Sequence, residues 1–251
     1  MSEETTMGRE FEIVREYETE AAPEQVWQAV TTGTAAWLWP MEFEPREGGR
    51  AAGGGVITAW DPPHRLTSRV EDPEGIGGMP QTLNVLDHLI EPREGGGAWV
   101  RYVHSGIFTG DWDDQYDGAS RHTDFYLHTL RQYLTYFTGL AAVHSDVQGP
   151  AASMKPGSFA AAVRALGVED AAEGDTVRVD LPGTGPVDAV LDFRNEHFAG
   201  LRTGDAMYRF FGRDAWGGPV GIALHRFGPD AAASREEAQE AWRSWLEGVY
   251  A

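Results

Sequence analysis

The sequence predicts an α+β fold in which a curved antiparallel sheet wraps around one long helix and encloses a pocket. Two observations support this prediction. The block from Gly48 to Gly106 consists of short extended segments separated by turns, and Asp61-Pro62-Pro63 stops one of these segments directly after Trp60. A helical stretch rich in Tyr and Leu then follows at residues 120–138. Several turn-delimited strands followed by one long helix are typical of such a sheet and helix pair.

The elements of the first half follow from local patterns. Phe11 to Glu20 alternates between apolar and polar residues, which indicates a half-buried strand. Pro23 suits the first turn of a short helix. Further strands are expected at about 54–60, 65–71, 81–91 and 98–108, between turns rich in Pro and Gly. The acidic stretch Asp111 to Asp117 is expected to be a solvated loop. The helix at 120–138 presents one apolar face, made of Phe125, Tyr126, Leu130, Tyr133, Leu134 and Phe137.

The second half repeats the order of elements more weakly. Ala142 to Gln148 could be a strand, a helix opens after Pro156, and four or five short strands fit between Thr176 and Phe227. Ser234-Arg235-Glu236-Glu237 has the pattern of a capping box before a last helix. We therefore expect a first domain at 9–140, a linker at 141–155 and a second α+β domain at 156–251. The second domain is either a reduced copy of the first or an α/β extension of a single domain.

Composition excludes several classes of partner. The chain has 251 residues, of which 20 are basic and 39 acidic, and the net charge of −19 would repel the phosphates of nucleic acids. The absence of cysteine excludes disulfides and thiolate chemistry. No apolar run is long enough for a membrane span, and the first residues do not resemble an export signal. We therefore expect a cytoplasmic protein with no nucleic-acid or membrane partner and no cofactor.

Two histidines and a tyrosine are the candidates for chemistry in the pocket. Side chains alternate along a strand, so Asn84, Leu86 and His88 share one face of their strand, as Val100, Tyr102 and His104 do of theirs. If the Gly-rich turn pairs Ile90 with Val100, His88 lies opposite Tyr102 and His104 opposite Leu86. Histidine can transfer protons near neutral pH, and a Tyr hydroxyl can polarise a carbonyl. The alternative is that His88, Tyr102 and His104 are ordinary core residues, or that a different register turns them to water.

A wider group of mostly apolar residues could contact a ligand. Trp37 and Trp39 could form a gate, or they could simply fill the core. Trp60 could stack on a ligand, or it could pack at the end of its strand. The expected ligand-binding set is Trp37, Trp39, Trp60, Asn84, Leu86, Val100, Tyr126, Leu130 and Tyr133.

The first half also resembles a known superfamily. The matching segments cover roughly residues 9–139 and are Ala22-Pro23-Glu24-Gln25-Val26-Trp27-Gln28-Ala29-Val30, Glu44-Pro45-Arg46-Glu47-Gly48-Gly49, Trp60-Asp61-Pro62-Pro63-His64-Arg65-Leu66, and His104-Ser105-Gly106 ahead of Leu130-Arg131-Gln132-Tyr133-Leu134. They are similar to the superfamily of START domains and polyketide cyclases, and within it to homologues of the heat-shock ATPase activator. This resemblance implies a helix-grip fold. The Gly-Trp pair that usually opens the last helix is replaced near Arg121-His122-Thr123-Asp124-Phe125.

Three function classes remain open after this reasoning. The first is a protein that binds an apolar or aromatic small molecule between the sheet and the long helix. The second is a small-molecule enzyme of cyclase or dehydratase type, in which His88, Tyr102 and His104 move protons on a carbonyl compound. The third, implied only by the resemblance, is a regulator of a chaperone ATPase. Binding is preferred because it demands the fewest specific residues. The sequence identifies no protein partner.

Overall fold

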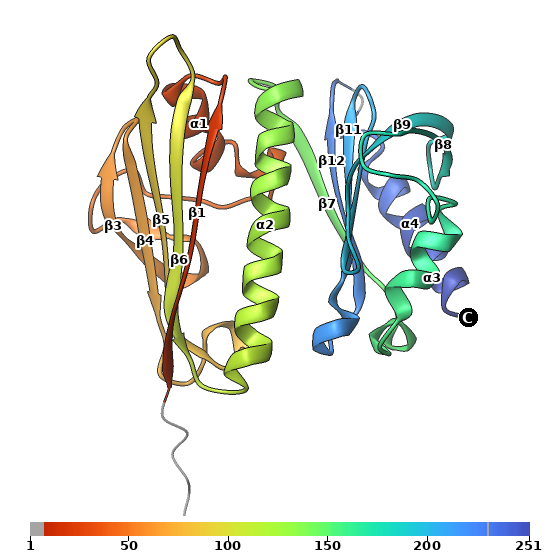
Figure 1. Ribbon diagram of the computed structural model, residues 1–251, viewed down its shortest axis with the longest axis horizontal. Helices are drawn as coiled ribbons and strands as arrows, with labels where there is room; N and C mark the ends of the chain where they lie inside the picture. The colour runs from red at the N-terminus through yellow and green to blue at the C-terminus, as the bar shows by residue number, and fades with distance from the viewer. Residues whose placement is uncertain (1–7, 230) are drawn as a thin grey trace, which may run out of the picture. The chain divides into compact units, whose positions relative to one another are not determined.

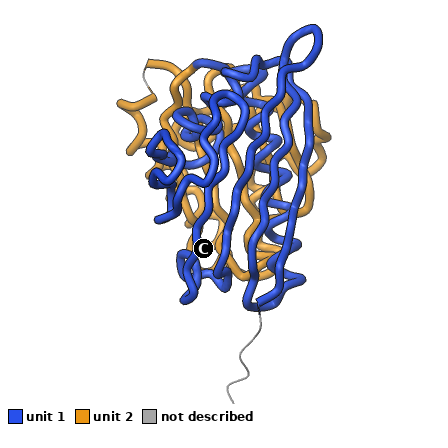
Figure 2. The backbone as a smooth tube through the Cα atoms, turned by 90° about the vertical axis from the view of Figure 1, so that its left-hand side faces the viewer, with its two compact units in different colours: residues 1–139 blue, residues 140–251 orange. Residues whose placement is uncertain are grey.

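The computed structural model describes residues 8–229 and 231–251. The chain divides into two compact units, Met1–Gly139 and Leu140–Ala251, which are coloured separately in Figure 2. The structure is α+β, with two six-stranded antiparallel sheets among the described residues. Each unit contains one of the sheets, so each is described by itself.

The first unit contains a six-stranded sheet and a long helix. The sheet has the order β1-β6-β5-β4-β3-β2, so β1 forms one edge and pairs with β6. Figure 1 shows α2 lying across one face of this sheet. Short 3₁₀ turns lie at Thr34–Ala36, Ala52–Gly54 and Ile76–Gly78. The bounds are β1 Arg9–Thr19, α1 Pro23–Val30, β2 Arg50–Ala51, β3 Gly55–Asp61, β4 Arg65–Glu71, β5 Gln81–Pro92, β6 Ala98–Phe108 and α2 Trp112–Tyr136.

The long helix begins earlier than the sequence pattern indicated. The stretch from Asp111 to Asp117 is not a loop, because α2 already starts at Trp112. The Asp111 side chain caps the helix by accepting a hydrogen bond from the Asp114 backbone N–H. Asp113 and Asp114 lie in the first turn, where carboxylates interact favourably with the helix dipole. The acidic residues that suggested a solvated loop therefore form the N-terminus of the helix.

The sheet of the second unit has the order β7-β12-β11-β10-β9-β8. Its core lies between the sheet and the helices α3 and α4, and Trp242 and Leu246 of α4 are fully buried there. Figure 1 shows both helices on one face of this sheet. The bounds are β7 Ala142–Gln148, α3 Ser158–Ala165, β8 Thr176–Leu181, β9 Gly185–Arg194, β10 Phe198–Arg202, β11 Ala206–Gly212, β12 Val220–Phe227 and α4 Arg235–Val249.

Two local expectations for the second half are wrong. The stretch 141–155, expected to be a linker, contains β7, which pairs with β12, and a 3₁₀ turn at Ala151–Met154. Ser234 precedes α4 but forms no capping box, because its hydroxyl instead accepts a hydrogen bond from Arg226 at 2.8 Å. Within the described residues, no helix is both long enough and apolar enough to cross a membrane.

Candidate functional site

A cavity of about 330 Å³ lies within the first unit, between its sheet and α2. Three walls enclose it: the face of β4, β5 and β6, one side of α2, and the loops around Trp37–Phe43 and Ile76–Met79. The residues that line it are Val30, Trp37, Leu38, Trp39, Met41, Phe43, Ala52, Gly53, Leu66, Ser68, Val70, Ile76, Met79, Gln81, Asn84, Leu86, His88, Tyr102, His104, Ala119, His122, Thr123, Tyr126 and Leu127.

The sheet wall is built from rows of residues that face one another across β4, β5 and β6. In one row Leu66 pairs with His88, which pairs with Tyr102. In the next row Ser68 pairs with Leu86, which pairs with His104. The pairing of β5 with β6 is the register expected from the sequence, with Ile90 opposite Val100.

A third row depends on a glycine. Val70 pairs with Asn84, which pairs with Gly106. A Cβ atom on Gly106 would lie 1.9 Å from the carbonyl oxygen of Leu83, so no other residue fits there without moving the backbone. The glycine of the His-Ser-Gly segment therefore lets β5 approach β6 at the end of the cavity where Asn84 lies.

His88 and Tyr102 are in ring contact on the floor of the cavity. Their ring centroids are 4.9 Å apart, and the planes are inclined at 58°. Burial lowers the pKa of His88 from 6.5 to about 4, although the neighbouring Asp87 carboxylate acts in the opposite direction. Burial also raises the pKa of the Tyr102 phenol, and a hydrogen bond with Thr123 opposes this effect. Near neutral pH the imidazole is therefore uncharged and the phenol is protonated.

His104 occupies the neighbouring row and packs edge-on against Phe11 of β1, with ring centroids 5.0 Å apart. Burial lowers its pKa to about 4, so this imidazole is also neutral near neutral pH. Several polar atoms in this part of the cavity have no protein hydrogen-bond partner. They are both ring nitrogens of His88, Nε2 of His104 and Oδ1 of Asn84. Each of these atoms is buried.

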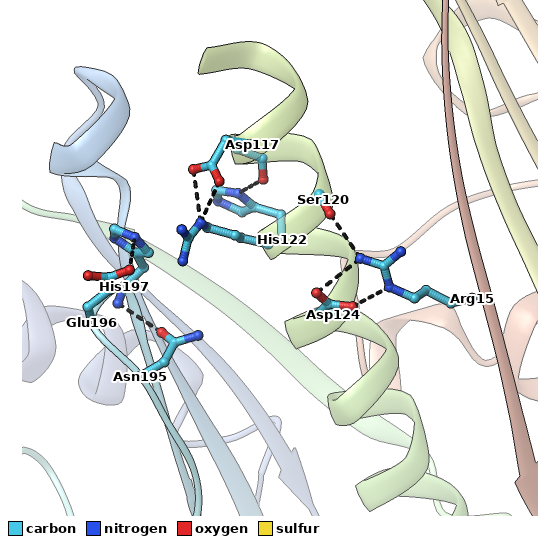
Figure 3. A network of polar contacts seen from close by, with 10 residues as sticks. Arg15, Asp117, Ser120, His122, Asp124, Asn195, Glu196 and His197 are labelled. Carbon is cyan, nitrogen blue, oxygen red and sulfur yellow. Dashed lines mark hydrogen bonds and ion pairs between the residues drawn. The ribbon is translucent and has the colours of Figure 1, made fainter. Parts of the chain in front are cut away.

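The helix wall is formed by one side of α2. His122 donates from Nδ1 to the Gly118 carbonyl at 2.7 Å, so in its neutral form Nε2 is the acceptor. Figure 3 shows how the helix is attached to the edge strand of the sheet: Arg15 of β1 donates to Asp124 from Nε at 2.5 Å and to Ser120 from Nη2 at 2.9 Å. These contacts hold α2 against the edge strand and so help to define the width of the cavity.

The loop wall is held by hydrogen bonds to α1 and to the following loop. The Trp37 indole donates to the Ala29 carbonyl at 2.9 Å, and the Thr34 hydroxyl accepts from the Met41 backbone N–H at 2.9 Å. Trp39 and Met79, by contrast, are 48% and 56% exposed although both line the cavity. They form an apolar rim, and Trp39 contacts Tyr126 of α2 with ring centroids 5.7 Å apart.

The structure brings some of the expected residues together and leaves others outside the cavity. Of the sequence-predicted set, His88, Tyr102, His104, Trp37, Trp39, Asn84, Leu86 and Tyr126 line it. Trp60 instead packs edge-on against Trp27 of α1, with centroids 4.9 Å apart. Val100 and Leu130 are completely buried in the core, and Tyr133 is 4% exposed, also outside the lining. Val100 lies one row beyond Tyr102 on β6, and Leu130 and Tyr133 lie beyond Leu127 on α2, past the end of the cavity lining. Trp60 pairs with Leu66 and so belongs to the row of His88 and Tyr102, but its ring packs on α1.

Sequence reasoning missed much of the remaining wall. On β4 the signal was present, because Leu66, Ser68 and Val70 alternate with Thr67 and Arg69 as residues of one strand face do. The loop residues Phe43 and Ile76 follow no periodic pattern, and no sequence signal could have placed them. Within the described residues, no group of three or more His, Asp or Glu is arranged to hold a metal ion.

Comparison with known proteins gives structural neighbours only. No protein-family model matches the chain, and no curated protein matches it. One neighbour is protein MLL2253 from Mesorhizobium loti, with 23% identity over 51% of this chain and 98% of that chain, and a TM-score of 0.40. Another is CalU16 from Micromonospora echinospora, with 21% identity over 51% and 77% of the two chains, and a TM-score of 0.39.

A third neighbour is the Aha1 dimer from Colwellia psychrerythraea, with 20% identity, coverage of 49% of this chain and 96% of that chain, and a TM-score of 0.40. Each match spans about half of the present chain.

Proposed function

We propose that the first unit binds a largely apolar small molecule in the cavity between its sheet and α2. The observation that carries this proposal is the cavity itself, whose 330 Å³ lie at the lower end of the range of ligand sites, about 300–1,000 Å³. Its lining is mainly aliphatic and aromatic, with a few convergent polar groups on β5 and β6. Ligand sites typically combine these two properties.

The buried polar atoms favour binding over a purely structural role. A buried donor or acceptor without a partner costs about 1–3 kcal/mol. His88, His104 and Asn84 all carry such atoms, so apolar residues at these positions would serve folding better. A ligand that forms hydrogen bonds to these atoms would offset the cost. These three residues, Asn84, His88 and His104, form a polar strip along β5 and β6. The polar strip therefore fits a site that is completed by its ligand.

The geometry also admits an enzyme of cyclase or dehydratase type, because His88 and Tyr102 are in contact and face the same cavity. Tyr102 could donate a hydrogen bond to a carbonyl and His88 could accept a proton. However, a general base works best when its pKa lies near the working pH, and burial lowers the pKa of His88 to about 4. At neutral pH this imidazole would be a weak base, so binding remains the preferred function. Regulation of a chaperone ATPase remains an expectation from the resemblance alone.

We further propose that the second unit is a reduced copy of the first. In both sheets the first strand of the unit pairs with the last strand, and the remaining strands follow in reverse sequence order. In both units a short helix follows the first strand and a longer helix follows the last strand. The strand order supports duplication because it involves every strand of both sheets.

Filling the cavity tests the binding proposal. Ser68 lies on β4 in the sheet wall, and Ser68→Phe would place a ring inside the cavity, whereas Ser68→Ala leaves the space open. The probe is Nile red, an uncharged apolar dye whose binding is measured by fluorescence titration, and we expect the wild-type protein to bind it in the micromolar range. The affinity should be unchanged in Ser68→Ala. In Ser68→Phe it should be weakened at least about tenfold, or about 1.4 kcal/mol. Equal affinity in a folded Ser68→Phe variant would refute the site. Native mass spectrometry of freshly purified protein would show any ligand that is retained.

A further inference from the structure

The lining of the cavity contains no acidic side chain and no Lys or Arg. Among its 24 residues there is no Asp, Glu, Lys or Arg, although the chain contains 59 such residues. Asp87, the closest carboxylate in sequence to the polar strip, is engaged by Arg65 at 3.0 Å and by Thr67. The two histidines of the polar strip are neutral near neutral pH. No Lys or Arg side chain lines the cavity to pair with an anionic ligand.

The unpartnered atoms of the strip favour a ligand that donates hydrogen bonds. A neutral imidazole has one donor nitrogen and one acceptor nitrogen, and both nitrogens of His88 lack a protein partner. One of them can therefore accept a hydrogen bond from the ligand. The Asn84 Oδ1 atom is also an acceptor without a protein partner. A carboxylate has only acceptors, so it could satisfy neither of these positions.

The strand register gives the polar strip its length. Asn84, His104 and His88 alternate between β5 and β6, because His104 pairs with Leu86, midway between the other two. Diagonal neighbours of this kind are about 7–8 Å apart between Cα atoms. Asn84 and His88 are four residues apart on one strand, which corresponds to about 13 Å. Polar groups of a ligand would thus lie along one edge, and its other edge would meet Leu66, Leu127 and the rim.

We propose that the cavity selects uncharged, elongated ligands that carry a hydroxyl or another hydrogen-bond donor, and that it discriminates against the corresponding carboxylates. This inference deepens the proposed binding function and rests on it. Removing a carboxylate from water into a site without a cation is strongly unfavourable, whereas a phenol of the same skeleton loses only hydrogen bonds that the polar strip replaces. Selection by charge therefore follows from the composition of the lining rather than from its shape.

Three probes with the same ring system separate charge from hydrogen bonding: 2-naphthol, 2-naphthoate and naphthalene. Affinities are measured near neutral pH by competition with Nile red, first for the wild-type protein and then for His88→Leu and Ser68→Phe. We expect 2-naphthol to bind at least about tenfold more tightly than 2-naphthoate and also more tightly than naphthalene. In His88→Leu the advantage of naphthol over naphthalene should shrink, because the acceptor nitrogen is gone.

Each other outcome has a distinct meaning. If 2-naphthoate binds as tightly as 2-naphthol, the inference about charge is refuted and the binding function stands. If naphthol and naphthalene bind equally to the wild type, the role assigned to the polar strip is refuted. If none of the probes and not even Nile red binds, the proposed function itself fails. Ser68→Phe identifies the site, since binding that survives in it takes place elsewhere.

Discussion

Acidification should destabilise the first unit through His88 and His104. Burial lowers the pKa of each imidazole from 6.5 to about 4, so the unfolded chain binds more protons than the folded unit within this window. The stability contributed by keeping the rings neutral is complete above the unfolded pKa and is lost as the pH falls towards the folded pKa. Stability should therefore decrease from about pH 7 to about pH 5, where most carboxylates are still ionised.

The magnitude follows from the two pKa values. For one group with pKa values of 6.5 unfolded and about 4 folded, linkage predicts a loss of about 2 kcal/mol between pH 7 and pH 5. Both histidines together give about 4 kcal/mol, which is large against the total stability of a typical domain, about 5–15 kcal/mol. Each single replacement by Gln should remove about half of this pH dependence, and the double replacement should remove most of it.

The measurement is urea unfolding at both pH values, with the first unit followed by hydrogen exchange of peptides from β5 and β6. This local readout is needed because burial also lowers the pKa of His144 in the second unit. Leu86→Met is the matched control, since it changes the same wall without adding or removing a titratable group. For each variant, only the difference in the free energy of unfolding between the two pH values is compared. Any effect of the introduced Gln side chain that does not depend on pH therefore cancels. Undiminished acid sensitivity in the double variant would refute the burial of these rings as neutral groups.

Three further predictions concern stability. Gly106→Ala should destabilise the first unit by about 3 kcal/mol in urea unfolding, because the added Cβ would lie 1.9 Å from the Leu83 carbonyl oxygen. A loss of stability below about 0.5 kcal/mol would instead show that β5 and β6 move apart easily. A double-mutant cycle of Arg15→Ala and Asp124→Ala should give a coupling of only about 0.2–1 kcal/mol, since both side chains are partly exposed. Trp242→Ala should cost the second unit about 3–5 kcal/mol by calorimetry, and a smaller loss would mean that α4 collapses into the space.

The sequence predicted the register between β5 and β6 correctly because strong local signals define it. Alternation fixed which residues share a face of β5 and of β6. The turn between the two strands contains Gly95, Gly96 and Gly97, which all adopt positive φ in the structure. A short connection leaves little freedom of register, so His88 could be placed opposite Tyr102 without any knowledge of the tertiary structure.

Where the prediction failed, competing interactions decided the outcome. Ser234 has the sequence context of a cap, but its hydroxyl accepts a hydrogen bond from Arg226 of β12. Arg226 lies eight residues before Ser234, outside the four residues that the capping-box pattern considers. The acidic residues after Asp111 were interpreted from their charge, although the same carboxylates stabilise a helix N-terminus. The loop walls of the cavity depend on how α1 and the sheet anchor Trp37 and Met41, which is a property of the folded unit.

The two units show how one strand order can serve two different interiors. In the second unit Trp242 of α4 lies completely buried against Tyr208 and Phe210, with ring centroids 5.8 and 5.6 Å away. These three rings occupy the middle of the layer between sheet and helix. In the first unit, Ser68, Leu86 and His104 form the middle row of the sheet face that is turned towards α2. The space between this row and α2 is the cavity. A packed interior stabilises a domain, whereas a hollow one lowers its stability. The difference therefore favours ligand binding by the first unit and a structural role for the interior of the second.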